Sequence, residues 1–360
     1  MSDRPLCFGQ RDRRRTVCAA CYTRRTCPPG SAHLGSETPD STPARFISGE
    51  IEASGFHLGH TLASGQLFRW GRDADGWWKG IAYGTAFHLR QAGNRVRFSA
   101  SGERIHTYAG TMPVSDFLRW YLRVDEAPRC RIPRGDRHLR KARDRLRGFR
   151  FARQEPFECI ISYVLSAQAR MSLTRQRITF LARILGEPVL FDEERYWTFP
   201  RPDVLCTLNG SYLRHRRFGW RSDWVATTAR HIVKALGNGG VARDVPLERW
   251  REIADQLRRI PRTGVGPKVG GCIDLFSLDR LHAVPVDTWV LKLAREWYGV
   301  EGGEPRVRAW AEQRGGRWAG YMNEYLFAYY RELNATSPHD RVITFCASDL
   351  PSPDLPFERV

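Results

Sequence analysis

The chain lacks two signals of membrane or secreted proteins. None of its apolar runs reaches the 18 residues that a membrane-spanning helix needs. The N-terminus also lacks the charged and then apolar pattern of a secretory leader. We therefore expect a soluble, intracellular protein with no membrane partner, in the cytoplasm and nucleoid, or in the nucleus if the host is a eukaryote.

Lysine is scarce although the chain is strongly basic. Only five of the 57 Lys and Arg residues are lysines, at positions 79, 141, 234, 268 and 292. The net charge is +18, which predicts a polyanionic partner. In so Arg-rich a chain, a simple phosphate contact would usually be Arg. A lysine within a candidate site therefore indicates that an amine is needed, because a guanidinium cannot lose its proton to become a nucleophile.

Disulfides are not expected either, because nine cysteines form an odd number in an intracellular chain. Four of them lie in the polar, Arg-rich residues 1–46 with the spacing C-x10-C-x2-C-x5-C. Such a segment is too polar to bury thiols, so a structural metal is predicted there. Four thiolates could hold Zn²⁺ or, alternatively, a 4Fe-4S cluster, and a metal-free segment is the third possibility. The ligands would be Cys7, Cys18, Cys21 and Cys27.

Composition divides the rest of the chain into three parts and predicts an α+β fold. Residues 47–126 contain four short β-rich runs (67–72, 77–83, 87–90 and 96–99), turns at 73–76 and 93–94, and a helix over 116–124. They predict an N-terminal antiparallel β-sheet domain. Residues 127–336 are predicted to form an all-α domain, and residues 337–360, with four prolines, a loosely ordered tail.

A helix-hairpin-helix is predicted within the helical part. Residues 246–260 begin with Pro246 and place apolar residues at helical spacing. Gly264 and Gly266 then allow a tight turn, and Lys268 opens a second apolar-periodic run. Such a turn directs backbone N–H groups and a helix N-terminus outward, where both suit a phosphate oxygen. Taken alone, the motif is equally typical of proteins that only grip the DNA backbone.

A carboxylate follows Lys268 at a distance of nineteen residues. Asp287 lies inside an apolar run that begins another helix, so it is a candidate N-cap and can serve a site as well. A lysine amine at a helix N-terminus, partly desolvated and near a carboxylate, is a plausible Schiff-base nucleophile. Lys268 and Asp287 are therefore the candidate catalytic pair.

The segment GVGPKVGGCIDLFSLDRLHAVPVDTW, residues 264–289, resembles the helix-hairpin-helix (HhH-GPD) DNA glycosylases, and within them the 8-oxoguanine DNA glycosylase/AP lyases. The resemblance implies that Lys268 attacks the deoxyribose C1′ and that Asp287 stabilises positive charge on the sugar. Glycosylases of the superfamily that only hydrolyse keep the Asp and lack the Lys. No catalytic cofactor is implied, only a monovalent cation at the hairpin carbonyls.

Three further segments resemble the base pocket of this family. In ASGQLFRW, residues 63–70, the Gly65 carbonyl would accept a hydrogen bond from N7–H of 8-oxoguanine, whereas normal guanine has a lone pair there. Residues 319–327 resemble the pocket helix, in which Phe327 would stack on the base and Asn323 stands where the family has Gln. Cys272 matches a cysteine stacked on the other face of the base, or is simply buried.

Two loops resemble DNA-contacting segments but depart from the family. The loop after the first core helix carries an Asn and an Arg in the 8-oxoguanine enzymes, where both read the opposite cytosine. Gln168 and Leu173 stand there in this chain, and Gln168 could plug the duplex by itself. Gly219, Trp220 and Arg221 occupy the places of a G-Y-R segment whose tyrosine is a wedge between base pairs.

The hypothesis is a monomeric bifunctional DNA glycosylase/AP lyase that acts on double-stranded DNA with a damaged base, 8-oxoguanine first, in base excision repair. One alternative is the same chemistry on another damaged or modified base. The other is a non-catalytic DNA-binding protein, for which changes at Lys268 and Asp287 would have no effect.

Overall fold

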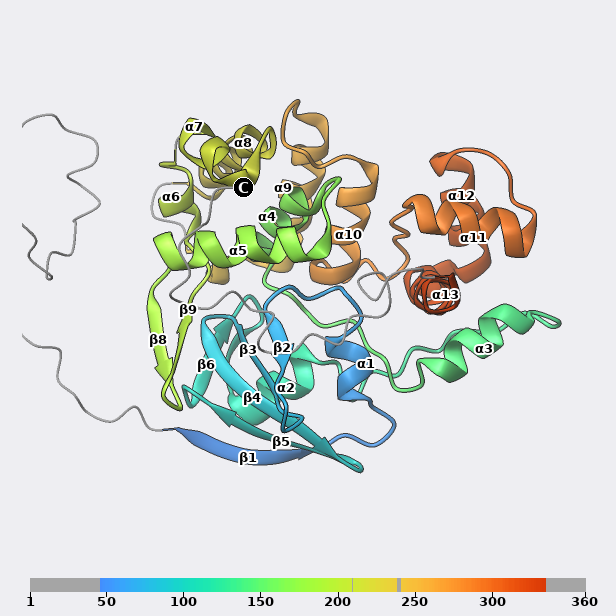
Figure 1. Ribbon diagram of the computed structural model, residues 1–360, viewed down its shortest axis with the longest axis horizontal. Helices are drawn as coiled ribbons and strands as arrows, with labels where there is room; N and C mark the ends of the chain where they lie inside the picture. The colour runs from blue at the N-terminus through green and yellow to red at the C-terminus, as the bar shows by residue number, and fades with distance from the viewer. Residues whose placement is uncertain (1–45, 209, 238–240, 335–360) are drawn as a thin grey trace, which may run out of the picture. The chain divides into compact units, whose positions relative to one another are not determined.

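The structure is a computed structural model that describes residues 46–208, 210–237 and 241–334 (Figure 1). The predicted metal site at Cys7, Cys18, Cys21 and Cys27 and the predicted tail lie outside these residues. Within them, no helix is long and apolar enough to cross a membrane.

An antiparallel sheet forms the first part of the described chain. Its strands are β1 (Ile47–Glu52), β2 (Trp70–Arg72), β3 (Trp78–Ala82), β4 (Thr85–Ala92) and β5 (Arg95–Ala100), in the order β1-β5-β4-β3-β2. The four predicted β-rich runs are confirmed, and β2 is shorter than predicted because residues 67–69 belong to the loop before it. β1 was not predicted.

One face of this sheet is covered by α2 (Val114–Tyr121), which the hairpin of β6 (Arg104–Thr107) and β7 (Gly110–Pro113) precedes. Phe87 and Leu89 of β4 form an apolar core with Phe117 and Tyr121 of α2. The helix ends three residues earlier than predicted, and Arg123 beyond it has a φ of +50°, which a continuing helix cannot accommodate. The short α1 (Leu58–Leu62) contributes to the same core.

The remaining described residues are mainly helical and build a second core around Trp250. A hairpin of β8 (Pro188–Phe191) and β9 (Glu194–Trp197), which was not predicted, interrupts the helices. A π-helical turn at Arg214–Phe218 and 3₁₀ turns at Ala242–Asp244 and Gly316–Trp318 connect helices. The α-helices are α3 (Arg137–Arg145), α4 (Pro156–Ser166), α5 (Met171–Leu185), α6 (Pro202–Leu205), α7 (Gly210–Leu213), α8 (Arg221–Leu236), α9 (Leu247–Arg259), α10 (Pro267–Ser277), α11 (Thr288–Tyr298), α12 (Glu304–Gly315) and α13 (Ala319–Asn334).

The predicted helix-hairpin-helix is confirmed as α9 and α10, and a charged network fixes their angle. Arg258 of α9 donates to the Gly270 carbonyl at 2.9 Å and to Asp274 of α10 at 2.5 Å. Arg280 bridges Asp255 of α9, at 2.7 Å, and Asp274, at 3.0 Å. The Arg280 hydrogen bond, ahead of the cost of partial burial, leaves the pKa of Asp255 below its usual value. These ion pairs hold the turn between the two helices in one orientation.

A close approach positions α13, the helix that carries Asn323 and Phe327. In Figure 1 α13 lies beside α3, although the two are separated by more than 170 residues, and they are in contact. Gly320, in its first turn, donates its N–H to the Leu281 carbonyl at 3.0 Å. A Cβ at Gly320 would lie 2.7 Å from that oxygen and 2.3 Å from Leu275 Cδ1, so only glycine lets α13 approach α10 and the loop after it.

Candidate active site

The hairpin turn is rigid on its inner side and open on its outer side. The Thr263 hydroxyl donates to the Leu257 carbonyl at 2.8 Å, and the Thr263 carbonyl accepts from Thr228 at 2.8 Å. Gly264 has a φ of +75°, and a Cβ there would lie 2.4 Å from Trp224. Gly266, the N-cap of α10, has no side-chain cap and faces open space. The first N–H groups of α10 are therefore available to an anion, as predicted.

Lys268 and Cys272 occupy one face of α10, a helical turn apart. Lys268 is half-buried, with its Nζ 5.8 Å from the ring centroid of Tyr163, and Cys272 is buried. Burial raises the pKa of the Cys272 thiol to about 11, although the charge and hydrogen bond of Lys268 act in the opposite direction. The thiol is therefore neutral near pH 7 and is a packing group, not a competing nucleophile.

Asp287 is the N-cap of α11, as its position before an apolar run predicted. Its Oδ1 accepts the N–H groups of Trp289 and Val290, each at 2.9 Å. Gly271 lets α10 pack directly on the segment that precedes Asp287, because a Cβ at residue 271 would lie 3.1 Å from Pro285 Cα. The charges of Lys268 and Asp287 both act on the Cys272 thiol. The structure therefore brings together the two predicted catalytic residues and Cys272.

The pocket helix α13 carries four further side chains of interest. Asn323 is buried, and Phe327, one turn later, is half-buried. The guanidinium of Arg331 lies 5.3 Å from the Phe327 ring centroid and 5.9 Å from that of Trp289. Glu324, between the two predicted pocket residues, is only 6% exposed. It was assigned no role from the sequence.

Gly65 lies in a loop that the helical part of the chain holds in place. Its φ is +89°, which favours glycine, and no described residue donates a hydrogen bond to its carbonyl. The next carbonyl, of Gln66, accepts from Gln154 at 2.8 Å and from the Tyr163 hydroxyl at 3.0 Å. The Gln66 side chain accepts the Ala152 N–H at 2.8 Å. The Gly65 carbonyl is thus free for a ligand while its neighbour is fixed.

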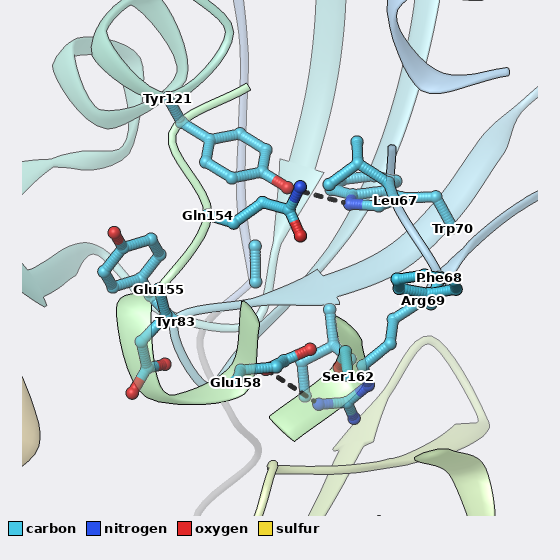
Figure 2. A pocket seen from close by; sticks show the side chains of 12 residues that line it. Leu67, Phe68, Arg69, Trp70, Tyr83, Tyr121, Gln154, Glu155, Glu158 and Ser162 are labelled. Atoms are coloured by element: carbon cyan, nitrogen blue, oxygen red, sulfur yellow. Dashed lines mark hydrogen bonds and ion pairs between the residues drawn. The ribbon is translucent and has the colours of Figure 1, made fainter. Parts of the chain in front are cut away.

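The residues after Gly65 line a pocket between the sheet and α4 (Figure 2). Trp70 donates to the Tyr121 hydroxyl at 3.1 Å, and Arg69 pairs with Glu158 of α4 at 3.3 Å. Burial raises the pKa of Glu158, although Arg69 acts against the shift. Neither Lys268 nor Asp287 lines this pocket. Its contacts anchor the second half of the loop and are separate from the catalytic pair.

The predicted plug and wedge are exposed. Gln168, in the loop between α4 and α5, is exposed with a φ of +50°, while Leu173 on α5 is half-buried. Trp220, just before α8, is 41% exposed. Its ring packs at 4.3 Å, edge to face, on Trp224, the residue that contacts Gly264. The wedge is thus in contact with the hairpin turn through one aromatic side chain.

Arg221, predicted to contact DNA, makes its described contacts within the protein. Its side chain is buried, and its guanidinium donates to the carbonyls of Ala167 at 2.6 Å and Gln168 at 2.8 Å. It also lies 4.1 Å from the Trp220 ring centroid. With these contacts Arg221 joins the plug loop to the wedge, and we assign it a positioning role.

Replacing Arg221 by Ala is expected to weaken binding to duplex DNA about tenfold, because two charge-assisted hydrogen bonds to the plug loop are lost. The dissociation constant is measured by fluorescence anisotropy at several salt concentrations. Arg230→Ala is the matched control, since it removes the same charge from an exposed position of α8. An equal loss in both variants would show that only net charge matters and would contradict the positioning role.

Several residues that shape the site were not found from the sequence. Gln154 and Tyr163 reach the Gly65 loop across more than 80 residues, and Thr263 closes the hairpin turn. No local pattern distinguishes them from ordinary polar residues on a helix or in a turn. The one available signal was Glu324, the only charged residue in residues 319–327 of the predicted pocket helix.

Comparison with known proteins agrees with this architecture. Residues 50–160 match the family model of the 8-oxoguanine DNA glycosylase N-terminal domain. The chain is 30% identical over 273 residues to N-glycosylase/DNA lyase OGG1 of Arabidopsis thaliana, covering 72% of this chain and 70% of that protein. It is 28% identical over 217 residues to a probable N-glycosylase/DNA lyase of Methanothermobacter thermautotrophicus, covering 54% and 68%.

Solved structures show the same fold. The apo 8-oxoguanine glycosylase/lyase of Clostridium acetobutylicum superposes with a TM-score of 0.64 at 25% identity, covering 79% of this chain and 96% of that one. The same enzyme in complex with double-stranded DNA containing cytosine opposite 8-oxoguanine gives a TM-score of 0.63, at 25% identity and with coverage of 79% and 93%. With the sheet and the helix-hairpin-helix in place, and with Lys268 and Asp287 both acting on the Cys272 thiol, the chain belongs to the 8-oxoguanine DNA glycosylase/lyase family.

Proposed function

We propose that the protein is a bifunctional DNA glycosylase and AP lyase that excises 8-oxoguanine from duplex DNA. The observation that carries the proposal is that Lys268, in the first turn of the uncapped helix α10, and Asp287, at the N-cap of α11, both act on the Cys272 thiol. A hairpin that only gripped phosphates would need neither a lysine amine nor a carboxylate near it. The net charge of +18 supports duplex DNA as the partner.

The reaction requires the target nucleotide outside the base stack. The exposed Trp220 and Gln168 support roles as wedge and plug, and the N–H groups of α10 support a phosphate contact. Lys268 then forms a bond to C1′ while the bond from C1′ to the base breaks and the base leaves with the electron pair. Asp287 stabilises the positive charge that develops on the sugar. The adduct becomes an imine, and β-elimination expels the 3′-phosphate.

Selection of 8-oxoguanine rests on the Gly65 carbonyl. No described residue donates to that oxygen, so it can accept N7–H of the oxidised base and repel the N7 lone pair of guanine. Phe327 and Cys272 supply apolar surface for the two faces of the base. Asn323 is shorter than the Gln of the family, and this departure keeps another damaged base as the second candidate substrate.

Two inorganic ligands remain part of the proposal. Carbonyl oxygens of the hairpin are the donors that a hard monovalent cation prefers, and within the described ranges those of Arg262 and Val265 accept no hydrogen bond. A cation there would supply one more positive charge for a DNA phosphate. For the N-terminal cysteines, Zn²⁺ stays the leading expectation and a cluster the alternative. Metal analysis with a visible absorption spectrum distinguishes the two.

The proposed function is tested by borohydride trapping on duplexes that carry 8-oxoguanine, a preformed abasic site or undamaged guanine. We expect a covalent adduct with the first two and none with the third, because borohydride reduces an imine only where Lys268 has reached C1′. Trapping at the abasic site alone would support the lyase activity and indicate that the substrate is another modified base. The absence of any adduct would refute the lysine mechanism.

A further inference from the structure

A buried acid on the pocket helix α13 has no part in the mechanism described so far. Glu324 follows Asn323 directly on α13 and is 6% exposed. Within the described part of the chain, its carboxyl group has no hydrogen-bond partner and no ion pair, and only the charges of Arg331 and Asp287 act on it. Burial of an unpartnered carboxyl group is costly, so such a group is rarely retained for packing alone.

The charges that act on Glu324 indicate that its carboxyl group lies on the side of α13 that faces α10 and α11. Asp287 acts on it from the N-cap of α11 and Arg331 from its own helix. In turn its charge acts on the Cys272 thiol of α10 and on the Tyr163 hydroxyl of α4. On the helices packed against α13, charged groups have partners other than Glu324: Arg145 of α3 pairs with Glu332, Glu296 of α11 accepts from the Tyr330 hydroxyl, and Arg314 of α12 pairs with Asp136.

We propose that the Glu324 carboxyl group is a base-recognition group that hydrogen-bonds the polar edge of the flipped purine beside the Asn323 amide. This inference rests on the proposed function and adds a specificity-determining residue to it. Asn323 is one methylene shorter than the Gln of related enzymes. A Glu side chain has the length of Gln, and Glu324 thus restores at the next position the reach that is lost at 323.

The protonation state makes the two side chains chemically alike. Burial raises the pKa of Glu324 to about 8; the Arg331 charge offsets part of the shift, and the Asp287 carboxylate adds a smaller increase. Below that pH the group is a neutral acid with one O–H donor and one carbonyl acceptor, the pattern of a Gln amide. A purine edge that presents both an acceptor and N–H donors fits it. Above that pH the donor is lost, and a second negative charge faces Asp287.

The test separates base release from lyase chemistry. Single-turnover release of 8-oxoguanine and incision of a preformed abasic site are measured at pH 7 for the wild type, Glu324→Ala and Glu324→Gln. Loss of one good hydrogen bond lowers base release about tenfold in Glu324→Ala, while Glu324→Gln stays within about threefold of the wild type. Incision of the abasic site, where no base is bound, stays unchanged in both. Glu332→Gln, the same change on the same helix outside the pocket, is the matched control.

A pH profile supplies a readout that a packing role would not affect. In the wild type, base release declines as pH rises past about 8, and in Glu324→Gln this decline is absent. The pH dependence of thermal stability reports the same ionisation of Glu324 in the folded protein. Because the folded-state pKa is raised, ionisation opposes folding increasingly between pH 4.5 and about 8, so Glu324→Gln gains stability over the wild type across that interval.

Each other outcome overturns the inference. Normal base release by Glu324→Ala would show that the base does not contact this group. An equal loss of base release and abasic-site incision would show a structural role. A Glu324→Gln variant as slow as Glu324→Ala would identify a proton donor and not a hydrogen-bonding group of Gln length. If the wild type incises abasic sites but releases no 8-oxoguanine, then 8-oxoguanine is not the substrate. That result would contradict the proposed function itself.

Discussion

Replacing Lys268 by Gln is expected to abolish base release, strand cleavage and borohydride trapping together, with a rate loss on the order of 10⁴-fold, as for other covalent nucleophiles. Lys268 is half-buried in the first turn of α10, where Gln is also a good helix former, so folding should be unaffected. Single-turnover kinetics on 8-oxoguanine and abasic duplexes measure the loss, and circular dichroism checks the fold.

Two further variants define the cause of that loss. Lys268→Arg keeps the positive charge and should still bind DNA, but it forms no imine because the guanidinium stays protonated. Lys292→Gln makes the same substitution at an exposed lysine of α11 and should leave activity unchanged. Strand cleavage by Lys268→Arg at a normal rate would mean that another amine attacks the sugar. It would remove Lys268 from the mechanism.

Asp287→Asn is expected to separate the two roles of this residue. An Asn oxygen can still accept the N–H groups of Trp289 and Val290, so the cap of α11 and the stability are retained. The negative charge that stabilises the sugar is lost, and removal of one such electrostatic group costs on the order of 10²–10³ in rate. Single-turnover kinetics and thermal unfolding are measured on the same preparation.

Asp287→Ala provides the comparison. It removes the charge and the cap together, so it should match the rate loss of Asp287→Asn and in addition lose about 1 kcal/mol of unfolding free energy. Wild-type rates in Asp287→Asn would contradict the catalytic assignment and leave Asp287 as a helix cap alone. A large loss of stability in Asp287→Asn would instead show that the charge matters for folding.

Where the fold follows from local patterns, it could be predicted from the sequence. Run 77–83 is rich in aromatic and apolar residues, run 96–99 alternates apolar and polar residues, and the two became β3 and β5. Pro246 and the glycines at 264 and 266 marked the hairpin because they act on their own backbone. β1 was missed because Ile51 is its only fully buried residue, so it has no amphipathic alternation, and pairing with β5, more than 40 residues away, determines it.

The same division applies to the active site. Lys268 and Asp287 could be identified from the sequence because the turn and the cap that position them are formed by neighbouring residues. The role of Arg221 could not, because an Arg beside a wedge residue looks like a phosphate contact until its burial and its bonds to the Gln168 loop are seen. Burial also decides the protonation state of Glu324, because it raises the pKa of the carboxyl group. The sequence alone therefore determined the candidate catalytic pair and the helix-hairpin-helix. Only the tertiary structure decided which polar side chains around them are buried, because burial depends on contacts between distant segments.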